Sequence, residues 1–149
     1  MLSIDANLLL YAYESSCPEH ERAYAFVTSL RQRDDVAVSE FILVELYNLL
    51  RNEVVVERPL SPSDAVDVIQ TYRRHPRWRL VAFPRPDAGI GDELWRLAAQ
   101  PAFPRRRIFD ARTALTLRHH GVTDFATSNV KDFEGFGFKR VWDPLRTEH

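Results

Sequence analysis

Residues 1–13, MLSIDANLLLYAY, place a single carboxylate between a short apolar strand and a helical segment. Leu2–Ile4 predicts the strand, and Ala6–Tyr13 predicts one or two turns of buried helix. Asp5 lies at the junction, where the strand would end. In parallel α/β sheets the carboxyl ends of the strands meet at one edge, and binding sites lie along that edge. The junction therefore predicts both a fold class and a place for a functional site.

The rest of the chain alternates short apolar strands with amphipathic helices. Ser39 and Ser61 are suited to cap the starts of two helices, and Gly121 is suited to end another. Strands separated by helices predict parallel βαβ units with helices on both faces of the sheet. We therefore expect a single α/β domain over residues 1–149. Its further strands are expected at 36–38, 80–83, 125–127 and 140–142, and its further helices at 19–31, 39–51, 61–72, 87–100 and 110–120.

The composition and charge of the chain exclude several classes of protein. The 149 residues are 45% hydrophobic and 28% charged, which is typical of one globular domain. Because 20 basic and 21 acidic side chains give a net charge of −1, the chain is not a uniformly basic nucleic-acid-binding protein. Cys17 is the only cysteine, which excludes an internal disulfide and a thiolate zinc cluster. The sequence shows no membrane span and no signal peptide, so we expect a cytoplasmic protein without membrane contact.

Asp5, Glu45 and Asp110 are candidates for a functional site. Each also has a simpler explanation: Asp5 as a turn or helix cap, Asp110 as the N-cap of the next helix, and Glu45 as the partner of an arginine. The helix around Glu45 is apolar on almost every side and is expected to be largely buried. All three positions can converge at one edge of a parallel sheet. Converging carboxylates repel one another and are stable there only with bound cations or with protons.

These carboxylates favour a hard divalent cation. Mg²⁺ and Mn²⁺ bind carboxylate oxygens, keep part of their water and are completed by a substrate phosphate. Zinc fits poorly, because His119 and His120 are adjacent and cannot share a helix face. A phosphate ester is therefore the expected kind of substrate.

Four motifs, in their order and spacing, resemble the PIN-domain ribonucleases and, among these, the VapC-type toxins of bacterial toxin–antitoxin modules. The motifs are Asp5-Ala6-Asn7, Val44-Glu45-Leu46, Phe109-Asp110-Ala111 and Phe125–Phe133. The resemblance covers nearly the whole chain. It implies a PIN-like three-layer α/β/α sandwich with a parallel five-stranded sheet. It also implies an Mg²⁺- or Mn²⁺-dependent endoribonuclease that hydrolyses the phosphodiester bonds of tRNA or another structured RNA.

The same resemblance assigns catalytic and metal-binding residues. Asp5, Glu45 and Asp110 match the first three acidic positions of the family. The fourth acidic position falls on Asn129, which has no charge but can ligate through its carbonyl oxygen. Asp132, three residues further on, is the alternative fourth ligand.

Other polar and basic residues are expected to support this site. Asn7 and Thr127 are expected to orient the carboxylates by hydrogen bonds. Because an acidic centre repels RNA, arginines must bind the RNA backbone. Trp78 is a candidate for stacking on an unpaired base, although a tryptophan is more often a packing residue. The expected RNA-binding residues are Arg105, Arg106, Arg107, Arg73 and Arg74.

The resemblance also implies a homodimer that a cognate antitoxin silences by filling the active-site groove. Two other functions remain open. The uncharged Asn129 is compatible with a catalytically weak PIN-fold module that binds RNA or protein. A phosphohydrolase of small esters would also place an Asp after the first strand. However, Asp5-Ala6-Asn7 lacks a second acid two residues on, and the sequence has no glycine-rich phosphate loop.

Overall fold

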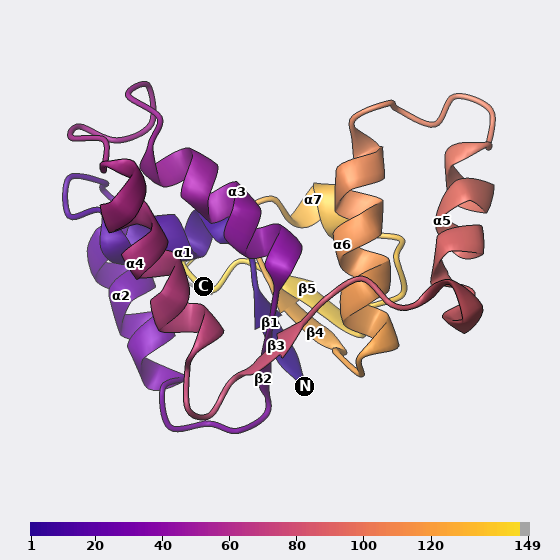
Figure 1. The fold of residues 1–149 in the computed structure, drawn as a ribbon, viewed down its shortest axis with the longest axis horizontal. Coiled ribbons are helices and arrows are strands. Elements are labelled where there is room, and N and C mark those ends of the chain that lie inside the picture. The colour runs from indigo at the N-terminus through magenta and orange to yellow at the C-terminus, as the bar shows by residue number, and fades with distance from the viewer. Residues whose placement is uncertain (147–149) are drawn as a thin grey trace.

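Five parallel strands form one sheet, in the order β3-β2-β1-β4-β5 (Figure 1). The computed structural model describes residues 1–146, so the last three positions of the expected domain lie outside it. The sheet confirms the expected five-stranded parallel arrangement. Its strands are β1 (Leu2–Ile4), β2 (Val36–Ser39), β3 (Arg79–Val81), β4 (Asp124–Ala126) and β5 (Arg140–Trp142).

Helices cover both faces of the sheet, which confirms the expected three layers (Figure 1). On one side lie α1 (Ala6–Tyr13), α2 (His20–Ser29), α3 (Glu40–Leu50) and α4 (Pro62–Arg73). On the other side α6 (Arg107–His119) packs against β2, and α5 (Ile90–Ala98) packs against α6. The short helix α7 (Val130–Phe133) contacts both α6 and β5. None of the helices within residues 1–146 is long and apolar enough to cross a membrane.

The strand order reverses between β1 and β4, at the centre of the sheet. From β1 the chain continues outward to β2 and β3, whereas β4 leads to β5 on the other side. Ile4 pairs with Ala126, so Asp5 and Thr127 leave the sheet next to each other. The Asp5 amide donates to the Ala126 carbonyl oxygen at 2.9 Å. α/β proteins bind ligands at such a reversal, outside the carboxyl ends of the strands.

Local signals in the sequence explain several element boundaries. The Ser39 hydroxyl accepts a hydrogen bond from the Phe41 amide at 3.0 Å, and the Ser61 hydroxyl accepts one from the Asp64 amide at 3.2 Å. Both predicted caps are therefore confirmed. Gly121 follows α6 with a φ of 91°, a left-handed conformation that glycine adopts without strain and that ends the helix.

Two predicted helices begin at other residues than expected. The segment expected as one helix over 87–100 is divided into a 3₁₀ turn, Pro86–Ala88, and α5. Gly89, with a φ of 81°, separates the two and prevents a continuous helix. The helix expected to start at Asp110 starts at Arg107, because a turn from Pro104, whose carbonyl accepts from the Arg107 amide at 2.9 Å, leads directly into it.

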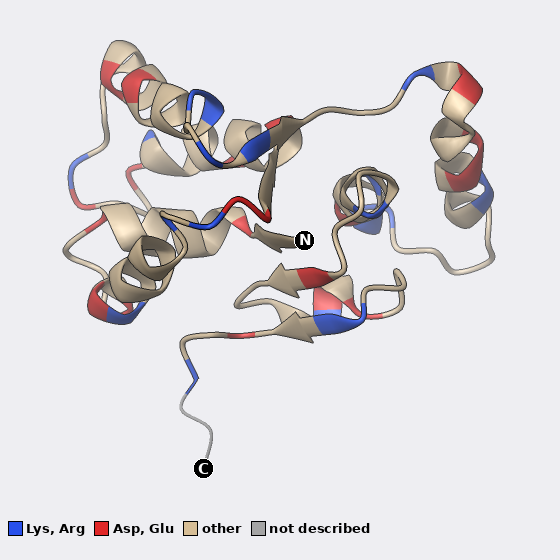
Figure 2. Cartoon of the chain, turned by 90° about the horizontal axis from the view of Figure 1, so that it is seen from below, with Lys and Arg blue, Asp and Glu red and all other residues tan. Residues whose placement is uncertain are grey.

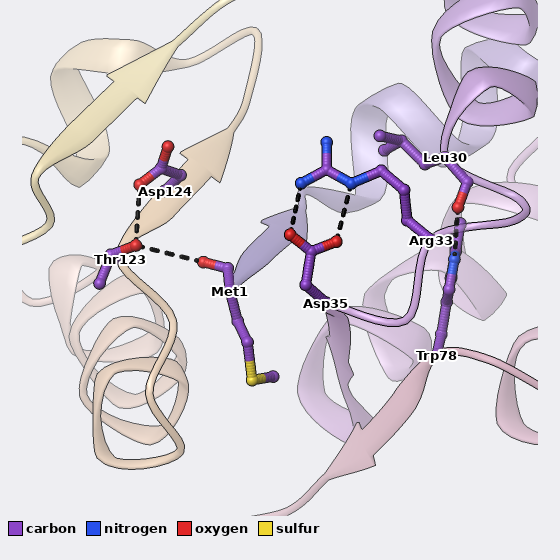
Figure 3. Close-up of polar contacts among 7 residues, drawn as sticks. All are labelled: Met1, Leu30, Arg33, Asp35, Trp78, Thr123 and Asp124. Atoms are coloured by element: carbon purple, nitrogen blue, oxygen red, sulfur yellow. Dashed lines mark hydrogen bonds and ion pairs between the residues drawn. The ribbon is translucent and has the colours of Figure 1, made fainter.

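Polar contacts close the sheet at its amino edge (Figure 3). Arg33 makes two hydrogen bonds to the Asp35 carboxylate, at 2.7 and 2.6 Å. The Thr123 hydroxyl donates to Asp124 at 2.8 Å. The carboxylates of Asp35 and Asp124 at this edge therefore have hydrogen-bond donors.

Trp78 is a core residue and not the exposed base-stacking side chain that the sequence suggested. Only 6% of its surface is exposed. Its indole N–H donates to the Leu30 carbonyl at 3.0 Å (Figure 3), and its ring stacks on His75 with centroids 4.4 Å apart. The burial of Trp78 is favourable because its ring packs against another ring and its N–H donor has an acceptor inside the protein.

Candidate active site

A pocket of about 570 Å³ at the carboxyl edge of the sheet brings the candidate carboxylates together. Asp5 contributes from the end of β1, Glu45 from α3 and Asp110 from α6. Apolar side chains complete the walls of the pocket. These are Phe41, Val44, Phe109 and Phe133.

Asp5 is the most enclosed of the carboxylates, with 4% of its surface exposed. One oxygen, Oδ1, accepts from the Ala6 amide at 2.8 Å, so Asp5 does cap α1. The other, Oδ2, accepts from the Thr127 hydroxyl at 2.7 Å, and Thr127 in turn accepts from the Asn129 amide at 2.9 Å. Desolvation raises the pKa of Asp5, and these hydrogen bonds offset that effect only in part.

Thr127→Val is expected to lower the free energy of unfolding by about 1–3 kcal/mol, because the substitution leaves the buried Asp5 Oδ2 without its donor and the Asn129 amide without its acceptor. Chemical denaturation at neutral pH measures this loss. Thr123→Val, which removes the half-buried hydroxyl beside Asp124 at the amino edge, is the matched control and should cost less. Equal losses for the two variants would contradict a special role for the Thr127 hydroxyl.

Glu45 and Asp110 lie close enough to the other acids to perturb their protonation. Desolvation, followed by the charges of Asp5 and Asp110, raises the pKa of Glu45 to about 7. Desolvation, followed by the charges of Asp132 and Asp5, raises the pKa of Asp110 to about 6, although Arg107 opposes the shift. Burial is the larger cause of both shifts, and repulsion between the acids adds to it.

The simpler explanations for Glu45 and Asp110 do not hold. The ion pairs found within residues 1–146 are formed by Arg33, Arg73 and Arg146, and none of them includes Glu45. Asp110 is not an N-cap, since α6 begins at Arg107.

The expectation that α3 is buried on almost every side is wrong. Its buried residues are Ile42, Leu43, Leu46 and Leu50, whereas Val44 is 66% exposed. Glu45 shares the exposed side and reaches solvent at the pocket. The apolar residues on this side line the pocket instead of entering the core.

The fourth acidic charge near the site comes from Asp132. Its carboxylate raises the pKa of both Asp5 and Asp110. Asn129 is exposed, and its backbone amide is bonded to Thr127. Asn129 and Asp132 both line a second pocket, of about 650 Å³, that also includes Trp142. Asp132 lies on the short helix α7.

Arg107 connects α6 to the segment that follows β4. Its guanidinium donates to the carbonyl oxygens of Asp132 and Glu134, at 3.3 and 2.9 Å. It also lies over the Phe136 ring, 4.4 Å from the centroid. These contacts keep α7, and with it Asp132, next to Asp110.

Arg107 and the other arginines expected to bind RNA are not among the residues that line the pocket, and neither is Asn7. Arg73 pairs with Glu40 at 2.9 Å. Basic positions are distributed over many elements of the chain and not gathered on one (Figure 2). The remaining candidates are exposed and carry no contact that excludes RNA: Arg74, Arg105 and Arg106.

One arginine that the sequence pattern did not single out does line the pocket. Arg112 lies two residues after Asp110 on α6. The signal that could have identified it is a lone arginine between Ala111 and Thr113, in a helix whose neighbouring side chains are buried.

The donors of the pocket fit a hard divalent cation in their chemistry. Asp5, Glu45 and Asp110 offer carboxylate oxygens, the ligands that Mg²⁺ and Mn²⁺ prefer, and a cation would offset the mutual repulsion that contributes to their raised pKa values. Within residues 1–146 no three His, Cys, Asp or Glu side chains are already close enough together to hold one ion. The fit therefore rests on the donor set and the mutual repulsion of its carboxylates.

The model of the PIN domain family matches residues 2–139, and the chain belongs to this family. Within the family it belongs with the VapC ribonucleases. It is 55% identical over 148 residues to Ribonuclease VapC24 from two strains of Mycobacterium tuberculosis, an alignment that covers 99% of each chain.

Solved structures share the fold. VapC20 of Mycobacterium tuberculosis, a sarcin–ricin loop-cleaving toxin, matches with a TM-score of 0.65 and 17% identity, over 93% of this chain and 96% of its own. FitAB bound to an IR36 DNA fragment matches with a TM-score of 0.61 and 19% identity, over 100% and 99% of the two chains. VapBC2 from Rickettsia felis, bound to a promoter DNA fragment, has a TM-score of 0.61 and 14% identity, over 95% and 97%.

Proposed function

We propose that this chain, as one domain, is a divalent-metal-dependent endoribonuclease that hydrolyses phosphodiester bonds in structured RNA, with tRNA as the first candidate. The observation that carries the proposal is the meeting of Asp5, Glu45 and Asp110 in one pocket with raised pKa values. The likeness to Ribonuclease VapC24 supports RNA as the substrate.

Asp5, Glu45 and Asp110 would hold Mg²⁺ or Mn²⁺, with Asp132 or Asn129 in the fourth position. A divalent ion there lowers the pKa of a bound water and offsets charge on the scissile phosphate. Thr127 and the Ala6 amide fix the orientation of the Asp5 carboxylate.

Incubation of the purified chain with bulk tRNA, with Mn²⁺ or with EDTA, tests the activity. We expect discrete fragments with Mn²⁺ and none with EDTA. Cleavage that persists in EDTA would contradict metal dependence. If RNA binds but is never cut with Mn²⁺ present, the second candidate is favoured, a binding module in which the uncharged Asn129 has removed catalysis.

Asp132→Asn is expected to weaken Mn²⁺ binding roughly 10–100-fold, because it removes the fourth negative charge near the cluster. Isothermal titration calorimetry measures the affinity. Asn129→Ala is the matched comparison in the same loop and should change the affinity less. The opposite order would make Asn129 the fourth ligand.

We also propose a cytoplasmic protein that is regulated by a cognate antitoxin and forms a homodimer. The likeness to VapBC2, a toxin–antitoxin structure, supports the antitoxin. Large exposed apolar side chains support protein contacts: Val44, Trp95 and Phe109 are 66%, 66% and 59% exposed. Light scattering of the purified chain, alone and with its antitoxin, tests both partners.

A further inference from the structure

Arg112 is the one feature of the pocket that the carboxylate site does not explain. Its guanidinium carbon lies 3.8 Å from the centroid of the Phe41 ring and 5.5 Å from that of Phe109. Its Nε is buried and has no hydrogen-bond partner within residues 1–146. None of the ion pairs found in that part of the chain includes Arg112. The Nε–H of a charged side chain in the pocket wall thus has no acceptor.

Such an arrangement has a cost in the free protein. Buried polar groups are nearly always hydrogen-bonded, and an unpartnered charged donor is among the most unfavourable exceptions. Burial lowers the pKa of Arg112, yet an arginine side chain stays protonated. The acids of the same pocket do not relieve this cost, since the charges that act on Glu45 and Asp110 come from other acids and from Arg107.

The geometry suits a planar anion with several oxygens. The guanidinium lies over two aromatic rings, which accept no ordinary hydrogen bond, so the N–H groups of its two terminal nitrogens are the ones left for an incoming group. A phosphate accepts two such N–H bonds side by side. RNA would bring phosphates into a pocket whose carboxylates repel them. A positively charged side chain in the pocket wall would offset that repulsion. The exposed ring of Phe109 offers a surface for a neighbouring base.

We propose that Arg112 binds a phosphate of the RNA backbone within the active-site pocket and so positions the substrate against the carboxylates. This inference rests on the proposed ribonuclease function. It makes Arg112 a positioning residue, distinct from the surface arginines that only attract RNA.

A purely structural role would have another signature. If Arg112 served only to pack α6 against Phe41 of α3, its replacement would lower stability and leave RNA binding unchanged. If the charge serves RNA, Arg112→Met keeps the apolar contact, removes an unpartnered charge and leaves the melting temperature equal or higher.

The test compares Arg112→Met and Arg112→Lys with the wild type and with Arg140→Met. Arg140 is a matched control, because it lies over the Trp142 ring at 4.0 Å and is paired in register with Asp124 at the amino end of β4, far from the pocket. Fluorescence anisotropy with labelled bulk tRNA in EDTA, from about 50 to 200 mM NaCl, gives affinity and salt slope without cleavage. Kinetics with Mn²⁺ give KM and kcat, and thermal melting checks the fold.

We expect Arg112→Met to bind tRNA roughly tenfold more weakly, to lower the salt slope by about 1 and to raise KM more than it lowers kcat. Arg112→Lys should recover part of the affinity, and Arg140→Met should resemble the wild type. Equal RNA binding by Arg112→Met and the wild type would overturn the inference while cleavage by the wild type still supports the ribonuclease.

The two proposals can fail separately. If the wild type binds tRNA without cutting it, and Arg112→Met binds more weakly, the phosphate contact stands and the ribonuclease function fails. If the wild type neither binds nor cuts tRNA, both are overturned.

Discussion

Asp110→Asn is expected to lower the rate of RNA cleavage by roughly 10²–10³-fold with the fold intact. Asp110 shares the pocket with Asp5 and Glu45, and the charges of Asp132 and Asp5 both contribute to its raised pKa. The amide has the same shape but lacks the charge that holds a divalent cation. The fragments produced from tRNA in Mn²⁺, followed over time, measure the loss.

The control for this variant is Asp124→Asn, the same chemical change at the other edge of the sheet. Asp124 accepts a hydrogen bond from Thr123 at 2.8 Å, which an asparagine oxygen also accepts. It should retain wild-type cleavage. If Asp110→Asn cut RNA as fast as Asp124→Asn, the carboxylate pocket would not be the site of hydrolysis.

Most of the fold could be predicted from the sequence because its signals are local. A strand that ends at Asp5, serine caps at Ser39 and Ser61, and a glycine stop at Gly121 each act within a few residues. Boundaries were wrong where the decisive residue lay outside the apolar pattern. Gly89 interrupts one helix, and the turn at Pro104 starts α6 earlier than Asp110.

The candidate site was predictable in its acids and not in its surroundings. Asp5 follows a strand end, Asp110 lies in the first turn of α6 and Glu45 lies in the middle of α3. The parallel sheet brings these positions to one edge. Which arginine shares their pocket depends instead on how α3 and α6 pack against each other. Arg107 is occupied by carbonyl oxygens of the segment after β4, whereas Arg112 lies against Phe41, which is distant from it in the chain. The buried neighbours of Arg112 on α6 are a local signal, whereas its contact with Phe41 depends on the packing of the two helices.

The metal-free protein is expected to be more stable at pH 5 than at pH 8. The pKa of Glu45 is raised to about 7 and that of Asp110 to about 6, so the folded chain holds protons that the unfolded chain has released. Between about pH 4 and 7 the folded state therefore binds more protons, and stability falls as the pH rises. Above that window the carboxylates are charged and repel one another, and the loss is complete.

Mn²⁺ should reverse this dependence, because it binds the charged carboxylates and competes with protons. At a concentration near 100 times its dissociation constant it should raise the melting temperature by roughly 5–10 °C at pH 8 and much less at pH 5. Glu45→Gln should raise the melting temperature of the metal-free protein at pH 8, flatten its pH dependence and shrink the Mn²⁺ effect.

Glu40→Gln tests whether this behaviour belongs to the pocket or to any acid of α3. Glu40 pairs with Arg73 at 2.9 Å outside the pocket, so its variant should lose a little stability and keep both the pH dependence and the Mn²⁺ shift. The prediction fails if the melting temperature of the metal-free protein does not fall between pH 5 and 8 and if Mn²⁺ raises it equally at both pH values. The carboxylates would then neither hold protons in the folded state nor form the site at which Mn²⁺ binds. The like-charge repulsion that supports the proposed metal site would then be absent.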